Sequence, residues 1–203
     1  LQTGYVGLGD EVVVRGKLVN YKGNTPELEK GCEIVSIKKN ANPTPDVEVT
    51  ELVNGDFESW NGSIPTGWKS ASTASNATLS QSTDAHGGNY AVLVGCTASA
   101  NKRLATQEIK LAAGTYTFSF YAKSTVSDKS QCRPGYVPVT DGSVGTYMYG
   151  DYASIKSTEW TLVSYEFTLT EETTVCLVVM NPKASSYADS QDILVDDATL
   201  VKK

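Results

Sequence analysis

The chain has 203 residues, and its 17 Lys and Arg against 23 Asp and Glu give a formal net charge of −6. Hydrophobic residues make up 40% and charged residues 20% of the chain, which excludes a disordered protein and allows one generous domain, or one domain with a small partner. The acidic balance excludes a typical nucleic-acid binder, which presents a basic field to phosphates, and no apolar run approaches the roughly 18 residues of a membrane span.

Two parts are expected, on either side of a linker at 41–49 in which two prolines interrupt any periodic pattern. The first part, 1–40, is rich in Val and Ile and is predicted to be β. Its strands are expected at Glu11–Val14, Lys17–Val19 and Cys32–Ile37. A piece of about 40 residues is near the lower limit for an independent core, so it is expected to pack on a neighbour or to be the remnant of a larger domain.

The second part, 50–203, is also predicted to be β throughout. Apolar and polar side chains alternate over Thr115–Lys123, so that Phe118 and Phe120 face one way and Tyr121 the other. Further strands are expected at Tyr90–Val94, Glu108–Leu111, Glu159–Thr170, Thr174–Met180 and Asp192–Val201. Short strands with Gly, Ser, Asn and Asp between them, and no helical stripe, predict an all-β jelly-roll β-sandwich.

The cysteines are widely spaced and form no Cys-x-x-Cys pair, so a zinc site of the usual spacing is not expected. They are Cys32, Cys96, Cys132 and Cys176. Two interpretations stay open. Either all four are free thiols, or one disulfide forms, for which Cys132 and Cys176 are the best candidates.

Catalysis has few candidate residues. The single histidine, His86, lies in an apparent loop, and the chain has neither a Gly-x-Ser-x-Gly elbow nor a phosphate-binding loop. A carboxylate pair such as Glu171–Glu172 is able in principle to hydrolyse a glycosidic bond, but this pair sits in a strand connection, where a solvated turn is the simpler interpretation. The chain is therefore predicted not to be an enzyme.

Acidic residues stand near both ends of the second part, at Asp56 and Glu58 and again at Asp196 and Asp197. They converge if the first and last strands are neighbours. Calcium takes about six to eight oxygens from carboxylates and backbone carbonyls, and a Gly-rich corner such as Gly87–Asn89 exposes carbonyls well. A calcium site and an exposed acidic edge are both open from spacing alone.

Several segments, in chain order, resemble carbohydrate-binding modules of the family 4/9 and 22 type. They are Leu52–Trp60 (LVNGDFESW), Ile64–Trp68 (IPTGW), His86–Val94, Leu111–Lys123, Trp160 with Tyr165–Phe167, and Ile193–Leu200 (ILVDDATL). The resemblance covers about 50–203 and implies a galactose-binding-like jelly roll. It also implies a structural calcium at one edge, with side-chain oxygens from Glu58 and Asp196 and a backbone carbonyl from Asn89.

In such modules sugars lie on the concave face or at loop tips, where a pyranose ring places its C–H groups against an aromatic face. The residues expected to contact a sugar lie in the middle of the chain: Tyr121, Arg133, Tyr136, Tyr147, Tyr149 and Asn181, with Tyr152 in the same cluster. For each tyrosine, edge packing is the alternative. Trp60 and Trp68 belong to the fold motif and are expected to pack.

The leading hypothesis is a non-catalytic module that binds an oligo- or polysaccharide, in an extracellular, cell-surface or periplasmic protein. A cell-adhesion or spacer domain with a protein partner and an accessory fragment of a larger glycan-degrading enzyme are the alternatives. Gly9–Leu28 resembles the later strands of an OB-fold, as in secreted proteins of Bacteroides-type bacteria, and about half of such a domain is present. The start without Met suggests a processed chain or a fragment, including that of a lipoprotein.

Overall fold

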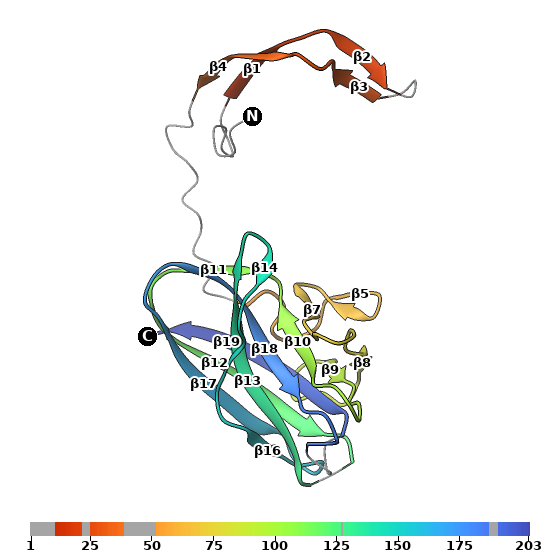
Figure 1. Cartoon of the computed structure of the whole chain (residues 1–203). Coiled ribbons are helices and arrows are strands. Elements are labelled where there is room, and N and C mark those ends of the chain that lie inside the picture. The colour runs from red at the N-terminus through yellow and green to blue at the C-terminus, as the bar shows by residue number, and fades with distance from the viewer. Residues whose placement is uncertain (1–10, 22–24, 39–51, 127, 187–190) are drawn as a thin grey trace. The chain divides into compact units, whose positions relative to one another are not determined.

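The computed structural model describes residues 11–21, 25–38, 52–126, 128–186 and 191–203. The chain forms two compact units, Leu1–Val47 and Glu48–Lys203 (Figure 1). Over the described ranges all regular structure is β-strand, which confirms the all-β prediction, and no helix there is long and apolar enough to cross a membrane. The predicted linker at 41–49 lies outside the described residues.

The first unit is a pair of antiparallel ladders. Strand β1 (Glu11–Arg15) pairs with β4 (Glu33–Lys38), and β2 (Leu18–Tyr21) pairs with β3 (Thr25–Leu28). At Gly16, between β1 and β2, a β-carbon would lie 2.7 Å from the β-carbon of Cys32. The close approach of the chain at Gly16 to Cys32 therefore requires glycine. Neither ladder covers the side chains of Val13, Val14 and Leu18. The OB-fold resemblance of this unit stays a prediction.

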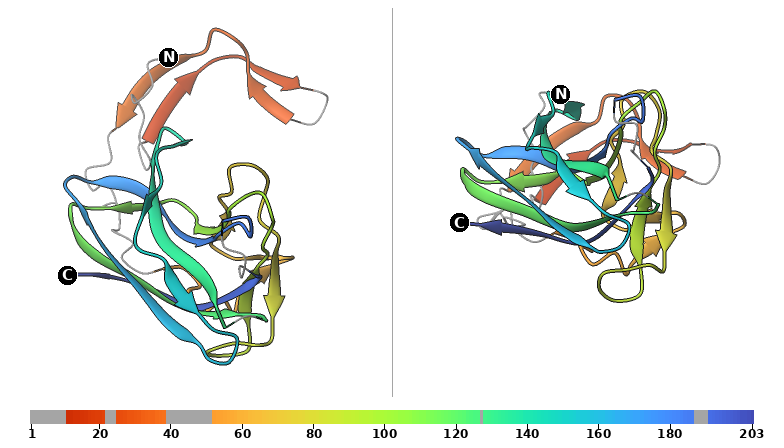
Figure 2. Two further views of the ribbon diagram at one scale, coloured as in Figure 1. Left: turned by 60° about the horizontal axis from the view of Figure 1, so that its bottom comes forward. Right: turned by 90° about the horizontal axis from the view of Figure 1, so that it is seen from below.

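The second unit is built from strands that are, in chain order, β5 (Trp60–Asn61), β6 (Ile64–Pro65), β7 (Trp68–Ser70), β8 (Leu79–Ser82), β9 (Ala91–Val94), β10 (Lys102–Thr106), β11 (Ile109–Leu111), β12 (Gly114–Ser124), β13 (Ser130–Thr140), β14 (Ser143–Val144), β15 (Met148–Tyr149), β16 (Ala153–Ile155), β17 (Thr161–Leu169), β18 (Thr173–Asn181) and β19 (Ile193–Lys202). One sheet has the order β17-β12-β19-β9-β8. The other has β14-β13-β18-β10-β7, with β11 beside β18 and β15 and β16 beside β13. The two sheets face each other (Figure 2), which confirms the predicted jelly-roll sandwich.

The main core lies between the two sheets, and the alternation predicted for β12 is confirmed. Phe118 and Phe120 are fully buried, with ring centroids 5.3 Å apart, whereas Tyr121 points away from the core. From the opposite sheet, Leu177 and Val179 of β18 are also fully buried in this core. Burying each such side chain contributes about 1.5–3 kcal/mol, so the sandwich is held chiefly by this apolar layer.

The first and last segments of the sandwich are tied together by the backbone. Ala198 of β19 donates its N–H to the carbonyl of Gly55 at 2.8 Å. The indole Nε1 of Trp68 donates to the carbonyls of Val53 and Asn54, both at 3.1 Å, and its ring packs 4.8 Å from that of Phe57. Trp68 is buried, so its predicted packing role is confirmed.

Strand β13 was not expected from the sequence, because Pro134 and Pro138 stand inside it. Towards β18 the ladder is continuous from Arg133 to Pro138. On its other side β13 meets β16, β15 and β14 in turn, and both breaks between these short ladders fall at the prolines. There the proline carbonyls accept the N–H groups of Gly150 and Gly145, at 3.0 and 2.8 Å. The N–H groups that the prolines lack would therefore have pointed to this interrupted side, and the ladder to β18 keeps all its hydrogen bonds.

All four cysteines are free thiols. On adjacent strands, Cys176 pairs with Val137 rather than with Cys132, and the two sulfurs lie on opposite faces of the sheet, since Cys132 belongs to the main core and Cys176 to the cluster on the other face. The disulfide interpretation is therefore wrong. Burial raises the pKa of the Cys132 thiol to about 12, so this thiol is inert at neutral pH.

Gly55→Ala tests the tie between the first motif and β19. A β-carbon at Gly55 would lie 2.1 Å from the carbonyl oxygen of Ala198, so we expect the free energy of unfolding to fall by about 2–3 kcal/mol. Gly62→Ala is the control: its φ is +63° but no atom lies within 4 Å, so only backbone strain of about 1 kcal/mol applies. Urea denaturation followed by tryptophan fluorescence measures both, and equal losses would contradict the clash.

Candidate functional site

Two arginines lie in one row on the outer face of the eight-stranded sheet. Arg103 of β10 and Arg133 of β13 are both register partners of Met180, which lies between them on β18. This face is the one away from the main core, because Ala105 and Val178 on the same side belong to a separate apolar cluster. The two guanidinium groups therefore share one surface.

Three tyrosines stack with these arginines. The Arg103 guanidinium lies 4.4 Å from the ring centroid of Tyr147, and the Arg133 guanidinium lies 4.9 Å from that of Tyr149 and 4.7 Å from that of Tyr152. The Tyr147 and Tyr149 rings are stacked, 5.8 Å apart at 8°. Together these five side chains form one continuous series of contacts, in the order Arg103, Tyr147, Tyr149, Arg133 and Tyr152, which we call the arginine–tyrosine stack.

Hydrogen bonds fix the stack to the sheet. Arg103 Nε donates to the hydroxyl of Tyr149 at 2.6 Å, and Arg133 Nε donates to the carbonyl of Gly150 at 2.6 Å. The Tyr147 hydroxyl donates to the carbonyl of Ala71. Burial raises the pKa of Tyr147, so its phenol stays neutral at physiological pH and keeps the proton that this hydrogen bond needs.

The stack covers an apolar patch. Tyr147, Tyr149 and Ala71 pack on buried side chains of β10, β13 and β18, namely Ala105, Val137, Val139, Cys176 and Val178. The outer face of the sheet is thus closed over its middle by the chain's own segment between β14 and β16. A ligand meets the edge of this segment rather than a bare sheet.

A groove of about 400 Å³ opens at that edge, between the segment and strand β17. Its lining residues are Pro134, Tyr149–Ala153 and Leu162–Glu166. Strand β17 is the outermost strand of its sheet, so alternate backbone N–H and C=O groups on its free side are open to a ligand. Gly150 allows the two walls to approach, because a β-carbon there would lie 2.6 Å from the Tyr165 ring. The volume falls in the range of about 300–1,000 Å³ that is usual for ligand sites.

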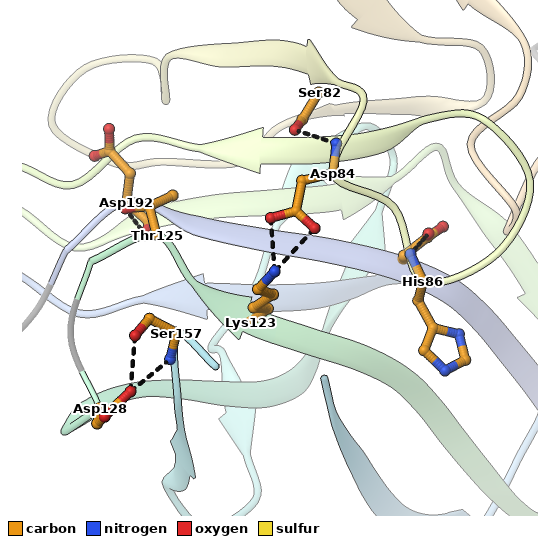
Figure 3. A network of polar contacts seen from close by, with 9 residues as sticks. Ser82, Asp84, His86, Lys123, Thr125, Asp128, Ser157 and Asp192 are labelled. Atoms are coloured by element: carbon orange, nitrogen blue, oxygen red, sulfur yellow. Dashed lines mark hydrogen bonds and ion pairs between the residues drawn. The ribbon is translucent and has the colours of Figure 1, made fainter. Parts of the chain in front are cut away.

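Tyr121 belongs to a different surface, the outer face of the five-stranded sheet. His86 stacks on its ring at 3.6 Å and 13°, and Trp160 meets His86 edge-on at 5.9 Å. Beside them Lys123 donates to both carboxylate oxygens of Asp84, at 2.9 and 2.7 Å (Figure 3). His86 covers one face of Tyr121, so this ring is less available for stacking than the rings of the arginine–tyrosine stack.

Of the six predicted ligand residues, the structure brings together three: Arg133, Tyr147 and Tyr149. Tyr136 instead stacks on Phe167 at 4.6 Å and packs against the main core. Asn181 is fully buried, and its Nδ2 donates to the backbone carbonyls of Val94 and Gln191. In this structure these two side chains support the fold and do not line the groove.

The sequence analysis missed Arg103, Asp151 and Tyr165. Arg103 stands in the short strand β10, which was not expected, and Tyr165 was considered only as part of a predicted strand, whereas it both packs against the main core and lines the groove. A signal for the site was nevertheless present: Pro134 and Pro138 are four residues apart, and Gly145 and Gly150 five. These prolines and glycines stand at the points where the segment 143–155 breaks its pairing with β13.

The predicted calcium residues do converge, on the loop 86–90. Glu58 Oε1 accepts the backbone N–H groups of Asn89 and Tyr90, at 2.6 and 2.9 Å, and Oε2 accepts the Asn89 side-chain amide at 3.0 Å. Asp196 Oδ2 accepts the N–H groups of His86 and Gly87 at 2.7 and 3.1 Å. The loop thus places hydrogen-bond donors against both acids.

This donor set does not fit a calcium ion. Each carboxylate oxygen of Glu58 already accepts an N–H group, and so does each of Asp196, whose Oδ1 accepts the N–H of Asp197 at 2.8 Å. Such donors repel a cation. Within the described ranges no group of three or more His, Cys, Asp or Glu is placed to hold a metal. The calcium that the resemblance implies stays a prediction.

Comparison with known proteins places this sandwich among modules that bind sugars. A profile of the family described as "Carbohydrate binding domain" matches residues 50–186. A search of curated proteins found no match.

Three solved structures have the same fold. The first is the CBM22-2 xylan-binding domain of Paenibacillus barcinonensis Xyn10C, with 14% identity, a TM-score of 0.54 and coverage of 73% of this chain and 97% of that one. The second is a family 16 carbohydrate-binding module, with 20% identity, a TM-score of 0.50 and coverage of 74% of this chain and 98% of that one. The third is an arabinose-bound α-L-arabinofuranosidase, with 15% identity, a TM-score of 0.54 and coverage of 75% of this chain and 26% of that one. At these identities the likeness concerns the fold alone.

Glu58→Gln is expected to change how stability depends on pH. Hydrogen bonds from the Asn89 side chain and from the backbone of Asn89 and Tyr90 hold the pKa of Glu58 below its ordinary value of 4.5. A lowered pKa gives stability that is present above about pH 4.5 and is lost as the pH falls through the pKa of the folded state. The variant should therefore melt at a lower temperature than the wild type at about pH 6 and approach it at about pH 3.

Thermal melts followed by circular dichroism across this range test the expectation. Burial raises the pKa of Asp196, so Asp196 changes the stability with pH in the opposite direction to Glu58. Because Asp196 is present in both proteins, its contribution cancels in the difference between their melting temperatures. Asp56→Asn, at an exposed position, is the control and should keep the wild-type profile. A difference in melting temperature between Glu58→Gln and wild type that is constant with pH would contradict the role of the Glu58 charge.

Proposed function

The chain belongs to the family of carbohydrate-binding domains, and from this premise we propose that it binds a glycan, without catalysis, in the groove between the arginine–tyrosine stack and strand β17. One observation carries the proposal: Tyr149 and Tyr152 line a groove of about 400 Å³, and both rings pack on the guanidinium of Arg133, at 4.9 and 4.7 Å. Rigid aromatic faces beside polar groups are what sugar recognition requires.

The groove offers a sugar both kinds of contact that it needs. The tyrosine rings accept the apolar C–H face of a pyranose. The hydroxyls of the sugar meet the carboxylates of Asp151 and Glu166 and the free backbone groups of β17. Because Arg133 and the ring of Tyr149 are fixed by hydrogen bonds, little side-chain freedom is lost when a ligand binds.

The two carboxylates of the groove support binding rather than hydrolysis. A glycosidase needs one carboxylic acid that protonates the leaving oxygen and a second carboxylate across the scissile bond. Glu166 forms an ion pair with Lys203, so its carboxylate has a cationic partner in the chain and is not free to serve as the acid at a leaving oxygen. The groove is therefore proposed to hold a glycan without cleaving it.

The proposal extends to the setting of the module. Modules of this family usually belong to extracellular proteins, so we place this one in a secreted, periplasmic or cell-surface protein. A second candidate is an accessory module of a larger glycan-degrading enzyme. It is supported by the arabinofuranosidase likeness, in which this fold makes up 26% of the longer chain.

Tyr149→Ala and Tyr152→Ala test the groove. Each removes one stacking face, so we expect affinity for a bound glycan to fall at least about tenfold, or about 1.4 kcal/mol. Affinity electrophoresis against xylan, β-galactan, pectin and sulfated polysaccharides gives the measurement. Tyr149→Phe, which keeps the ring and loses only the hydroxyl bonded to Arg103, should lose less.

Tyr121→Ala is the matched control, because Tyr121 lies on the other sheet, and it should bind as the wild type does. If Tyr121→Ala abolishes retention while both groove variants bind normally, the ligand lies on the five-stranded sheet instead. Thermal melts of each variant confirm that lost binding does not reflect lost folding.

Chelation tests the structural calcium that the resemblance implies. Because N–H groups satisfy Glu58 and Asp196, we expect the melting temperature to be the same with calcium and with EDTA. A melting temperature that falls with EDTA in the wild type, and no longer responds in Glu58→Ala, would establish the calcium site and a rearranged loop 86–90.

A further inference from the structure

We propose that Asn61 is a site of spontaneous chemical modification, where the folded protein loses ammonia and gains an aspartyl or isoaspartyl residue, and that Asn54 is protected from the same reaction. This inference goes beyond the proposed function and does not rest on it. The chain contains the dipeptide Asn-Gly twice, at 54–55 and at 61–62, and the two copies lie in opposite environments.

The reaction needs only the asparagine, the glycine that follows it, and water. The backbone nitrogen of the glycine attacks the carboxamide carbon of the asparagine, so that an N–Cγ bond forms and the Cγ–Nδ2 bond breaks. The proton of the glycine N–H goes to the leaving amide, which departs as ammonia. Water then opens the succinimide ring at either of its carbonyl carbons and yields aspartate or isoaspartate. Glycine favours the attack because no β-carbon shields its nitrogen.

Asn61 lies at the exposed tip of the β5–β6 hairpin. It is the last residue of β5, and Gly62 and Ser63 form the turn that leads to Ile64 of β6 (Figure 1). All four residues are exposed. A β-carbon built on Gly62 meets no atom within 4 Å, so no neighbouring group crowds the attacking nitrogen. Exposed tips of small and polar residues have the most conformational freedom in a fold.

The two reacting groups at this tip are not held apart by other contacts. Among the described residues, the carboxamide of Asn61 has no hydrogen-bond partner. In the same part of the chain, the N–H of Gly62 donates to no backbone carbonyl. The carboxamide carbon of Asn61 is therefore able to approach this nitrogen without the loss of a hydrogen bond from either group.

Asn54 has the opposite environment. Its Nδ2 donates to the carbonyls of Ser59 and Thr66, at 2.9 and 3.0 Å, and its Oδ1 accepts the N–H of Ser59 at 2.8 Å. The next residue, Gly55, is buried, and its carbonyl accepts the N–H of Ala198 at 2.8 Å. The attack requires the carboxamide to give up three hydrogen bonds, each worth about 0.5–1.5 kcal/mol. Asn54 therefore reacts only from a locally opened state.

The modified hairpin is expected to stay attached to the sandwich, because the reaction leaves the contacts at its base intact. The indole of Trp60 donates to the carbonyl of Phe57, and its ring packs against the main core. Thr66 donates its N–H to the carbonyl of Ser59 at 2.9 Å. The product thus adds one negative charge at the tip and, in isoaspartate, one methylene group to the main chain.

The test follows both asparagines in the folded full chain, incubated in a mildly alkaline buffer at physiological temperature. Digestion with trypsin and a glutamyl endoproteinase yields the peptides 52–58 and 59–69, each with one Asn-Gly dipeptide. Mass spectrometry then measures the conversion of amide to acid, and a sample digested at the start corrects for conversion during digestion. We expect Asn61 to convert at least about tenfold faster than Asn54, because Asn54 reacts only after local opening.

Two controls separate the effect of the fold from that of the dipeptide. In concentrated urea both environments are lost, so the two asparagines should convert at nearly equal rates. Gly62→Ala places a β-carbon beside the attacking nitrogen and should slow the conversion of Asn61 several-fold. The converted wild type should melt at nearly the same temperature as the fresh protein, since the change is confined to the tip.

Two results would overturn the inference. One is equal conversion of Asn54 and Asn61 in the folded chain. The other is a folded chain in which Asn61 keeps its amide while both asparagines convert in urea, which would show that the hairpin tip is protected as well.

Discussion

The two prolines of β13 set the architecture of the binding side of this module. A proline has no N–H to donate, so a strand that contains two of them can complete a ladder on one side only. Pro134 and Pro138 turn their carbonyls to Gly150 and Gly145, and the opposite side of β13 pairs with β18 without interruption. The side of β13 that lacks these donors thus faces the edge of the sheet, where the chain pairs with it only as three short strands, β14, β15 and β16.

The arginine–tyrosine stack follows from that break. Between the short strands the chain leaves the ladder at Gly145 and Gly150, and the intervening tyrosines turn back over the outer face of the sheet. There they shield apolar side chains such as Val137 and Val178, which a solvated face would not carry. The burial that secures this segment also fixes the rings of the groove, so this carbohydrate-binding module obtains its rigid wall from the same contacts that close its sheet.

What the sequence could predict depended on whether the relevant information was local. The alternation of β12 and the motif from Leu52 to Trp68 are local patterns, and both the jelly roll and the burial of Trp68 followed from them. The position of Arg103 beside the tyrosines depends on register across three strands, with Met180 between the two arginines, and no local pattern contains that register. The burial of Asn181 depends on distant neighbours in the same way, because the backbone carbonyls that its side chain contacts belong to Val94 and Gln191.

The net charge of the chain does not determine the charge at its groove, because charge acts locally in a salt solution. The chain has a net charge of −6, but only those acids that face the groove act strongly on a ligand there. Glu58 and Asp196 instead accept hydrogen bonds from backbone N–H groups of loop 86–90. These two acids therefore help to join the early and late segments of the sandwich. In the groove, by contrast, the charged lining residues are Asp151 and Glu166, and Glu166 is paired with Lys203. The charge that a ligand meets is therefore decided by which side chains the fold places in the groove and by their partners, and not by which charges the composition has in excess.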